Sequence, residues 1–184
     1  MMTGREAPGG PEALSRSRAV PRTLVAMEPT VRRVEPQATW ALRQAVLRPH
    51  QSIEQVGLGD EGDGELVAYA AVDPATEEAV STATVRREPP PFDPGAVSAA
   101  GAPAWRLRGM ATREDRRRTG IGGRVLSAVI EHVATSGGGL LWCNARLPAR
   151  ALYERAGFVT VGEPWDDPDI GPHIVMWRLV APRP

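Results

Sequence analysis

Hydrophobic positions along this chain follow two different periods, and the period changes several times after Thr30. Apolar residues three and four positions apart, the spacing of an amphipathic helix, occur over residues 38–46 and again over 121–133. A shorter segment of this kind, LPARALYERAGF over 147–158, reaches Gly157, where glycine suits the left-handed turn that closes a helix. We therefore expect three helices.

Further segments have the short, β-rich or continuously apolar composition of strands. They are TVRRVEP, GELVAYAAVD, EEAVSTATVRR, WRLRGMAT, GLLWCNA, FVTVGE and HIVMWRL, at residues 30–36, 64–73, 77–87, 105–112, 139–145, 158–163 and 173–179. We expect a hairpin around Asp73 and Pro74, and a polar loop over 164–172 between the last two strands. The resulting order, β-α-β-β-β-α-β-α-β-β, predicts a mixed α/β domain.

Two stretches follow neither period. Residues 1–28 mix Pro, Gly, Ser and Arg with few apolar residues, and we expect a mobile tail because this composition supports no core. Residues 89–103 are rich in Pro, Ala and Gly and are expected to form a surface loop. The remaining pattern predicts a single domain over 29–182.

Composition narrows the classes of partner. The 22 basic residues, all arginine, balance 22 acidic ones, so net charge gives no reason to expect nucleic acid or a membrane surface. No apolar run approaches the roughly 20 residues that cross a bilayer. The single cysteine, Cys143, excludes an internal disulfide and a cysteine cluster for a metal, so we expect no metal cofactor and a cytoplasmic location. The oligomeric state stays open, a homodimer included.

The segment RRRTGIGGRVL, residues 116–126, joins three arginines to a glycine cluster at the start of the long helix. A P-loop would need Gly-Lys before Ser or Thr, and the chain contains no lysine. A dinucleotide-binding fingerprint, G-x-G-x-x-G, would need its third glycine two positions beyond Gly123. It would also need an acidic residue where the chain has Cys143 and Asn144.

The segment matches R-x-x-G-x-G instead, with Arg117, Gly120 and Gly122 in place. Glycines let backbone N–H groups approach a ligand, and the first turn of a helix adds unpaired N–H groups and a positive dipole. Such a turn suits a pyrophosphate. A flexible turn followed by solvated arginines would have the same sequence, so the motif alone leaves both interpretations open.

The wider context carries a family resemblance. The glycine turn with its preceding strand, MATREDRRRTGIGG, and the downstream ALYERAGF resemble the GNAT superfamily of acyl-CoA-dependent N-acyltransferases over about residues 30–179. The resemblance implies a fold with a splayed central sheet and an N-acetyltransferase that uses acetyl-CoA as co-substrate. The acceptor would be the amine of a small molecule, which attacks the thioester directly. A non-catalytic acyl-CoA-binding sensor or interaction module is the alternative.

The resemblance also implies how acetyl-CoA binds. Met110, Ala111 and Thr112 would provide a strand edge for the pantetheine, and the backbone N–H near Met110 would stabilise the oxyanion. A core methionine is compatible with this role, because only the backbone is used. The pyrophosphate would bind the backbone amides of Arg117, Arg118, Thr119, Gly120, Ile121, Gly122 and Gly123. The neighbouring arginines, Arg116 and Arg124 among them, add positive charge.

Three more residues become candidates by their positions in the family pattern. Tyr153 would protonate the departing thiolate, the alternative being a core aromatic. His173 would suit a general base near the acceptor, although a lone histidine before an apolar run is often structural. Asn144 would either bind pantetheine or order a loop.

Acceptor specificity would reside in the first helices and the last hairpin. There, Arg43 and Arg48 suit a carboxylate, while Asp166, Asp167 and Asp169 suit an amine. Ordinary surface charge explains all of them equally well.

Overall fold

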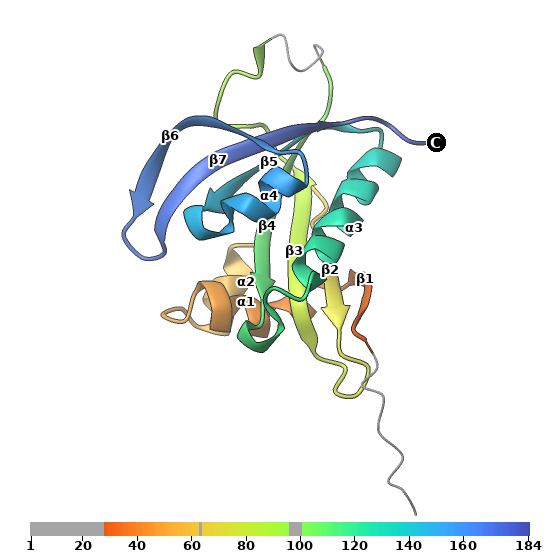
Figure 1. Ribbon diagram of the computed structural model, residues 1–184, viewed down its shortest axis with the longest axis vertical. Coiled ribbons are helices and arrows are strands. Elements are labelled where there is room, and N and C mark those ends of the chain that lie inside the picture. The colour runs from red at the N-terminus through yellow and green to blue at the C-terminus, as the bar shows by residue number, and fades with distance from the viewer. Residues whose placement is uncertain (1–27, 63, 96–100) are drawn as a thin grey trace, which may run out of the picture.

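The computed structural model describes residues 28–62, 64–95 and 101–184. All but the last residue of the predicted tail, 1–28, therefore lies outside the described residues, as does part of the predicted loop, and the single-domain boundary stays a prediction. The described chain forms one seven-stranded sheet in the order β1-β2-β3-β4-β5-β7-β6 (Figure 1). The strands are β1 (Thr30–Val34), β2 (Val67–Val72), β3 (Ala79–Arg87), β4 (Ala104–Thr112), β5 (Gly139–Arg146), β6 (Val159–Asp167) and β7 (Gly171–Val180).

Helices cover both faces of this sheet. They are α1 (Trp40–Leu47), α2 (Ile53–Leu58), α3 (Ile121–Thr135) and α4 (Arg150–Arg155), with 3₁₀ turns at Pro36–Thr39, Glu114–Arg116 and Leu147–Ala149. The apolar stripe of α3, including Val125 and Val129, is fully buried in a core shared with β3 to β5 and α4, while α1 packs on β3 and β4 (Figure 1). No helix of the described segments is long and apolar enough to span a bilayer.

The mixed α/β fold and its splayed sheet, predicted from the sequence, are confirmed. The hairpin at Asp73 and the left-handed conformation of Gly157 also hold, with a φ of 79° at that glycine. Helix α2 was not predicted, although Ser52 and Gln55 form a reciprocal capping box that marks its start. The predicted loop over 164–172 is wrong in extent, because β6 continues to Asp167 and β7 begins at Gly171.

The splay arises between β4 and β5. These parallel strands pair only from Ala104–Leu140 to Arg106–Trp142, and beyond that point no ladder joins them. The remainder of β4 pairs with β3 on its other side. The second half of β4 therefore presents one unpaired backbone edge toward β5.

A bulge bends β4 in the part of the strand that does not pair with β5. The register with β3 shifts so that Arg108 pairs with Thr84 but Ala111 pairs with Thr82, which leaves Gly109 and Met110 opposite one residue. Gly109 has a φ of 57°, and a Cβ there would lie 2.8 Å from Nε of Arg43. Both the backbone conformation and the close helix contact therefore require glycine.

An ion pair supports the bulge from the α1 side. The buried Arg43 side chain donates from Nη1 to Oδ2 of Asp60 at 2.6 Å, and Trp40 Nε1 donates to the same oxygen at 2.8 Å. The side chains of Arg43 and Asp60 are only 8% and 10% exposed. Removing one partner would leave a buried, uncompensated charge.

Replacement of Arg43 by methionine tests this support. We expect the free energy of unfolding of Arg43→Met to fall by about 3–5 kcal/mol in urea denaturation, because Asp60 loses its counter-charge in a buried position. Arg32→Met is the matched control, since Arg32 pairs with Glu77 on the surface, where both side chains are more than half exposed. Equal losses in the two variants would contradict a special role for the buried pair.

Candidate active site

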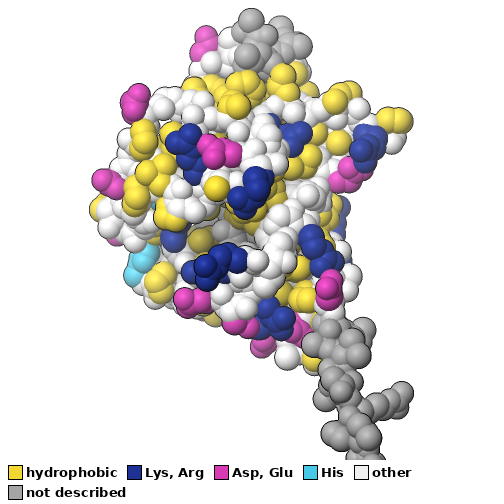
Figure 2. Space-filling model, in the orientation of Figure 1, with side chains coloured by type: hydrophobic (Ala, Val, Ile, Leu, Met, Phe, Trp, Pro, Cys, Tyr) yellow, Lys and Arg dark blue, Asp and Glu magenta, His cyan; other side chains and the backbone are white. Residues whose placement is uncertain are grey.

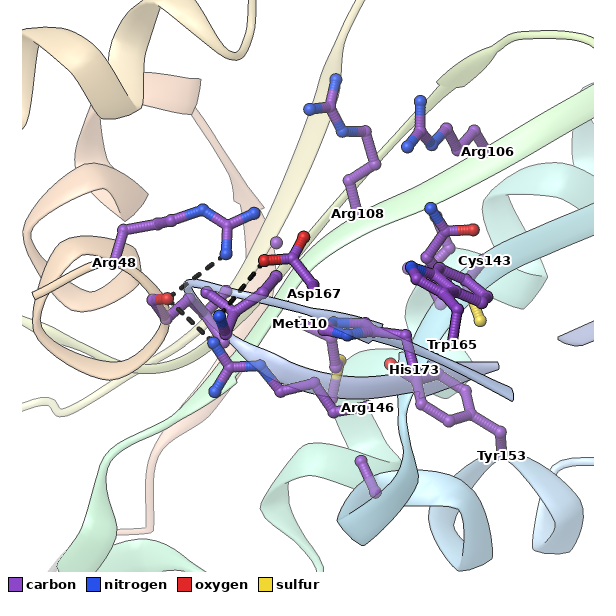
Figure 3. A pocket seen from close by; sticks show the side chains of 16 residues that line it. Arg48, Arg106, Arg108, Met110, Cys143, Arg146, Tyr153, Trp165, Asp167 and His173 are labelled. Atoms are coloured by element: carbon purple, nitrogen blue, oxygen red, sulfur yellow. Dashed lines mark hydrogen bonds between the residues drawn. The ribbon is translucent and has the colours of Figure 1, made fainter. Parts of the chain in front are cut away.

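The gap between β4 and β5 opens into a cavity of about 310 Å³, which we call the central pocket (Figure 3). Its walls come from the end of α1, the bulged part of β4, the end of β5, the start of α4 and the β6–β7 hairpin. Four of the residues singled out from the sequence, Met110, Asn144, Tyr153 and His173, line it together. Among the described residues, no group of three or more His, Cys, Asp and Glu side chains could hold a metal ion.

Tyr153 lies in α4 and is only 4% exposed. Its ring packs edge-on against Phe158, with 5.6 Å between ring centroids, and the Phe158 N–H donates to the Tyr153 carbonyl at 3.0 Å beyond the Gly157 turn. Burial, and to a lesser degree the nearby Cys143, raises the pKa of Tyr153 well above its usual range. A tyrosine is protonated at neutral pH even without this shift, so the phenol carries a proton that it can donate.

Met110, Ala111 and Thr112 form the end of β4, beside the start of α3. Ser81 ties the β3 side of this stretch, since its hydroxyl donates to the Ala111 carbonyl at 3.1 Å and lies 2.8 Å from Oγ1 of Thr112. A Cβ on Gly122 would lie 3.1 Å from that Oγ1 and 3.4 Å from the Met110 methyl carbon. Glycine at 122 thus lets the helix approach the strand closely.

The turn before α3 presents a row of free N–H groups. Gly120 is the N-cap residue with a φ of 85°, and Arg118 also has a positive φ, 61°. The first hydrogen bond of the helix runs from the Arg124 N–H to the Gly120 carbonyl at 3.1 Å. Within the described chain, the N–H groups of residues 118–123 have no acceptor. With the helix dipole, they form a nest of N–H groups whose chemistry suits an anion.

The arginines near this turn are not equivalent. Arg116 is held by Asp73 at 3.3 Å, and Arg124 by Glu28 at 3.4 Å. Arg117 and Arg118 are exposed and, in the part of the chain that the structure covers, lack carboxylate partners.

Beside the turn, a second cavity of about 640 Å³ lies between α3 and α4, with Gly120 and Gly123 in its wall. Figure 2 shows arginine side chains bordering a hollow in the middle of the face of the molecule that it draws.

His173 is 5% exposed, and its ring stacks on Trp165 with 5.7 Å between centroids. Its Nδ1 lies 2.6 Å from the carbonyl oxygen of Gly171. A carbonyl oxygen only accepts, so Nδ1 must carry a hydrogen and donate it. In the neutral ring, Nε2 is then the free acceptor, which is the form that a general base requires.

Two neighbours on β5 differ in character. The Asn144 side chain is exposed in the central pocket, where its amide is available to a ligand. Cys143 is buried, and desolvation raises the pKa of its thiol far above the usual range, so the thiolate is suppressed.

The charged candidates for acceptor binding are only partly brought together. Arg48 and Asp167 line the central pocket, whereas Arg43 is engaged beneath the bulge with Asp60. The structure adds Arg108 and Arg146, which the sequence did not single out. Arg106 and Arg108 are two residues apart on a strand that was predicted. Side chains at this spacing share one face of a strand, so the sequence could have placed both arginines on the same face.

Comparisons with known proteins agree with this architecture. The sequence model of the Acetyltransferase (GNAT) family matches residues 25–158. The uncharacterized N-acetyltransferase YitI of Bacillus subtilis (strain 168) is 33% identical over 161 residues, covering 82% of this chain and 95% of YitI.

Solved structures show the same fold at low identity. An aminoglycoside 6'-N-acetyltransferase complexed with coenzyme A is 18% identical with a TM-score of 0.60, over 84% of this chain and 99% of that one. The ribosomal-protein-S18-alanine N-acetyltransferase of Escherichia coli is 18% identical with a TM-score of 0.59, over 86% and 97%. From the family match and the YitI similarity, the chain belongs to the GNAT acetyltransferase family and is an acyltransferase.

Proposed function

We propose that this protein transfers the acetyl group of acetyl-CoA directly to the amine of a small-molecule acceptor. One observation carries the proposal: the unpaired edge of β4 runs from the glycine turn to a pocket that contains Tyr153 and His173. The nest of N–H groups at residues 118–123 suits the pyrophosphate, and Arg117 and Arg118 add charge for the phosphates.

The β4 edge would bind the rest of the cofactor. Pantetheine is an extended chain with two amides, so it can pair with the free backbone of residues 110–112 as an added strand would. The thioester carbonyl would accept a hydrogen bond from the Met110 N–H, placed by the bulge at Gly109. That donor stabilises the negative charge that develops on the oxygen during attack. Asn144 would contact the pantetheine from the β5 side.

The proton transfers follow from the two buried rings. The amine nitrogen forms a bond to the acetyl carbon, and the carbon–sulfur bond then breaks. His173 would take the amine proton at Nε2, directly or through water, because its Nδ1 is committed to Gly171. Tyr153 would protonate the departing thiolate, since it lines the pocket and its hydroxyl carries a proton at neutral pH.

A non-catalytic acyl-CoA sensor would need the nest but neither ring. The presence of Tyr153 and the oriented His173 in one pocket therefore favours the enzyme. A cytoplasmic location, where acetyl-CoA is made and a lone cysteine stays reduced, remains a prediction, and the oligomeric state stays open, a homodimer included.

A carboxylate introduced at Gly123 tests whether the nest of N–H groups binds the pyrophosphate of CoA. A Cβ at this position meets open space, so Gly123→Ala and Gly123→Glu should both fold. An acidic residue in the first turn also favours the helix dipole, so the melting temperature of Gly123→Glu should not fall. We expect calorimetry to show at least a roughly 10-fold loss of CoA affinity in the glutamate variant and little change in the alanine variant, because the carboxylate repels the pyrophosphate. Unchanged affinity in Gly123→Glu would contradict this placement.

Removal of the Tyr153 hydroxyl tests whether this residue is the general acid. Tyr153→Phe keeps the ring against Phe158 but cannot donate a proton, so kcat should fall by roughly 10²-fold while CoA affinity and melting temperature hold. Tyr69→Phe, at the half-buried tyrosine of β2, is the matched control and should keep full activity. Wild-type turnover by Tyr153→Phe would show that water or another group is the acid.

A further inference from the structure

Arg108 lies half-buried in the wall of the central pocket without a partner. Among the described residues, no hydrogen bond or ion pair satisfies its guanidinium. Buried or half-buried arginines are ordinarily paired, because an isolated charge is costly to remove from water. This one stands on β4, at the start of the bulge.

The carboxylates around Arg108 are already used. Glu88 accepts from Arg106 at 2.5 Å and from Arg86 at 3.3 Å, so two arginines share one acid. Asp60 is bound to Arg43. Burial, followed by the positive charges of Arg106 and Arg86, lowers the pKa of Arg108 to about 10, although Glu88 opposes the shift. Among the described residues, the carboxylates around Arg108 are therefore engaged by other arginines.

The opposite end of the central pocket is also cationic. Arg48 and Arg146 both donate to the Leu47 carbonyl, at 3.4 and 2.8 Å, rather than to a carboxylate (Figure 3). Asp167 is the acidic side chain in the described wall, and its Oδ1 accepts from the N–H groups of Asp169 and Ile170 in the hairpin turn. Three arginines without an acid partner thus face one carboxylate that the fold already engages.

We propose that the acceptor carries an anionic group, a carboxylate or a phosphate, on the same small molecule as its amine, and that Arg108 binds this group. The proposal rests on the proposed function, since it names the acceptor class of that site. A guanidinium presents two parallel N–H donors, which match either oxyanion. Arg108 precedes Met110 by two residues, about 7 Å along a strand at most. The bound anion and the reacting amine therefore fit within one small molecule.

The same charges disfavour a polycationic acceptor. An aminoglycoside carries several ammonium groups. Arg48, Arg108 and Arg146, which have no carboxylate partner among the described residues, would repel them, whatever the shared fold with aminoglycoside acetyltransferases. The pocket therefore differs in charge from what such a substrate requires.

The test is a CoA-release assay with acetyl-CoA and matched acceptors. The anionic arms are the common α-amino acids and O-phosphoethanolamine; the neutral arms are the α-amides of the same amino acids and ethanolamine; kanamycin is the polycationic arm. Because Cys143 is buried, a thiol reagent reports the released CoA. We expect at least one anionic acceptor to exceed its neutral counterpart by roughly 10-fold or more in kcat/KM, and the preferred arm identifies carboxylate or phosphate.

Arg108→Gln assigns the preference to this side chain. It should raise the KM of the anionic acceptor by roughly 10-fold or more, the same factor as the preference that it removes, and leave the KM of acetyl-CoA and turnover of the neutral analogue unchanged. Its melting temperature should hold or rise, because an unpaired charge among like charges is removed. Arg32→Gln is the surface control.

Several results would overturn the proposal. They are a neutral amine or kanamycin as the better acceptor, a preference that survives in Arg108→Gln, or a lower melting temperature in that variant with equal losses on both acceptor classes. Turnover confined to neutral or polycationic amines would refute the anionic acceptor and leave the acetyltransferase intact. No turnover with any amine, although acetyl-CoA binds, would refute both.

Discussion

The short pairing between β4 and β5 is the constraint on which the rest of the site depends. Parallel strands normally continue their ladder, and here it stops at Arg106 and Trp142. The bulge at Gly109 bends β4 beyond that point, and the buried ion pair of Arg43 and Asp60 supports the bend from α1. An unpaired strand edge inside a protein is costly unless a ligand satisfies it, so this geometry implies an extended, amide-containing ligand.

The two ends of this edge have different electrostatics. The glycine turn offers backbone N–H groups and exposed arginines, which suit a multiply charged phosphate that stays partly solvated. The central pocket instead combines the buried rings of Tyr153 and His173 with half-buried arginines. Arg108 has no hydrogen-bond or ion-pair partner among the described residues, which is unfavourable for the free protein and is the basis of the proposed anion site.

Local patterns predicted much of this molecule. Period and composition located the strands and three helices, and the glycine turn was visible because R-x-x-G-x-G requires no tertiary information. Helix α2 was missed for a local reason: a six-residue helix carries too little periodic signal, and its Ser52–Gln55 capping box was the available clue. The extent of β6 was missed because Pro164 and the acidic residues after it are typical of a loop.

The pocket itself was less predictable, because it depends on which strands are neighbours. Arg48, Arg108 and Arg146 lie on three different elements, and only the topology brings them together. Arg43 illustrates the converse: the sequence left it open between acceptor binding and ordinary surface charge, and the structure places it against Asp60 and Gly109. An arginine that is paired with a carboxylate has a structural role, whereas one without such a partner is available to a ligand. Ion pairs between distant segments cannot be derived from one sequence.

Amide hydrogen exchange, resolved by residue, tests the central claim most directly. In the free protein the N–H groups of residues 118–123 have no acceptor in the described chain and should exchange rapidly. Saturating acetyl-CoA should slow exchange at these residues and at Met110 by roughly 10-fold or more, because each N–H gains an acceptor, while residues in the β2–β3 turn stay unchanged. Unchanged exchange at residues 118–123 and Met110, with calorimetry showing that acetyl-CoA is bound, would place the cofactor elsewhere and contradict this account.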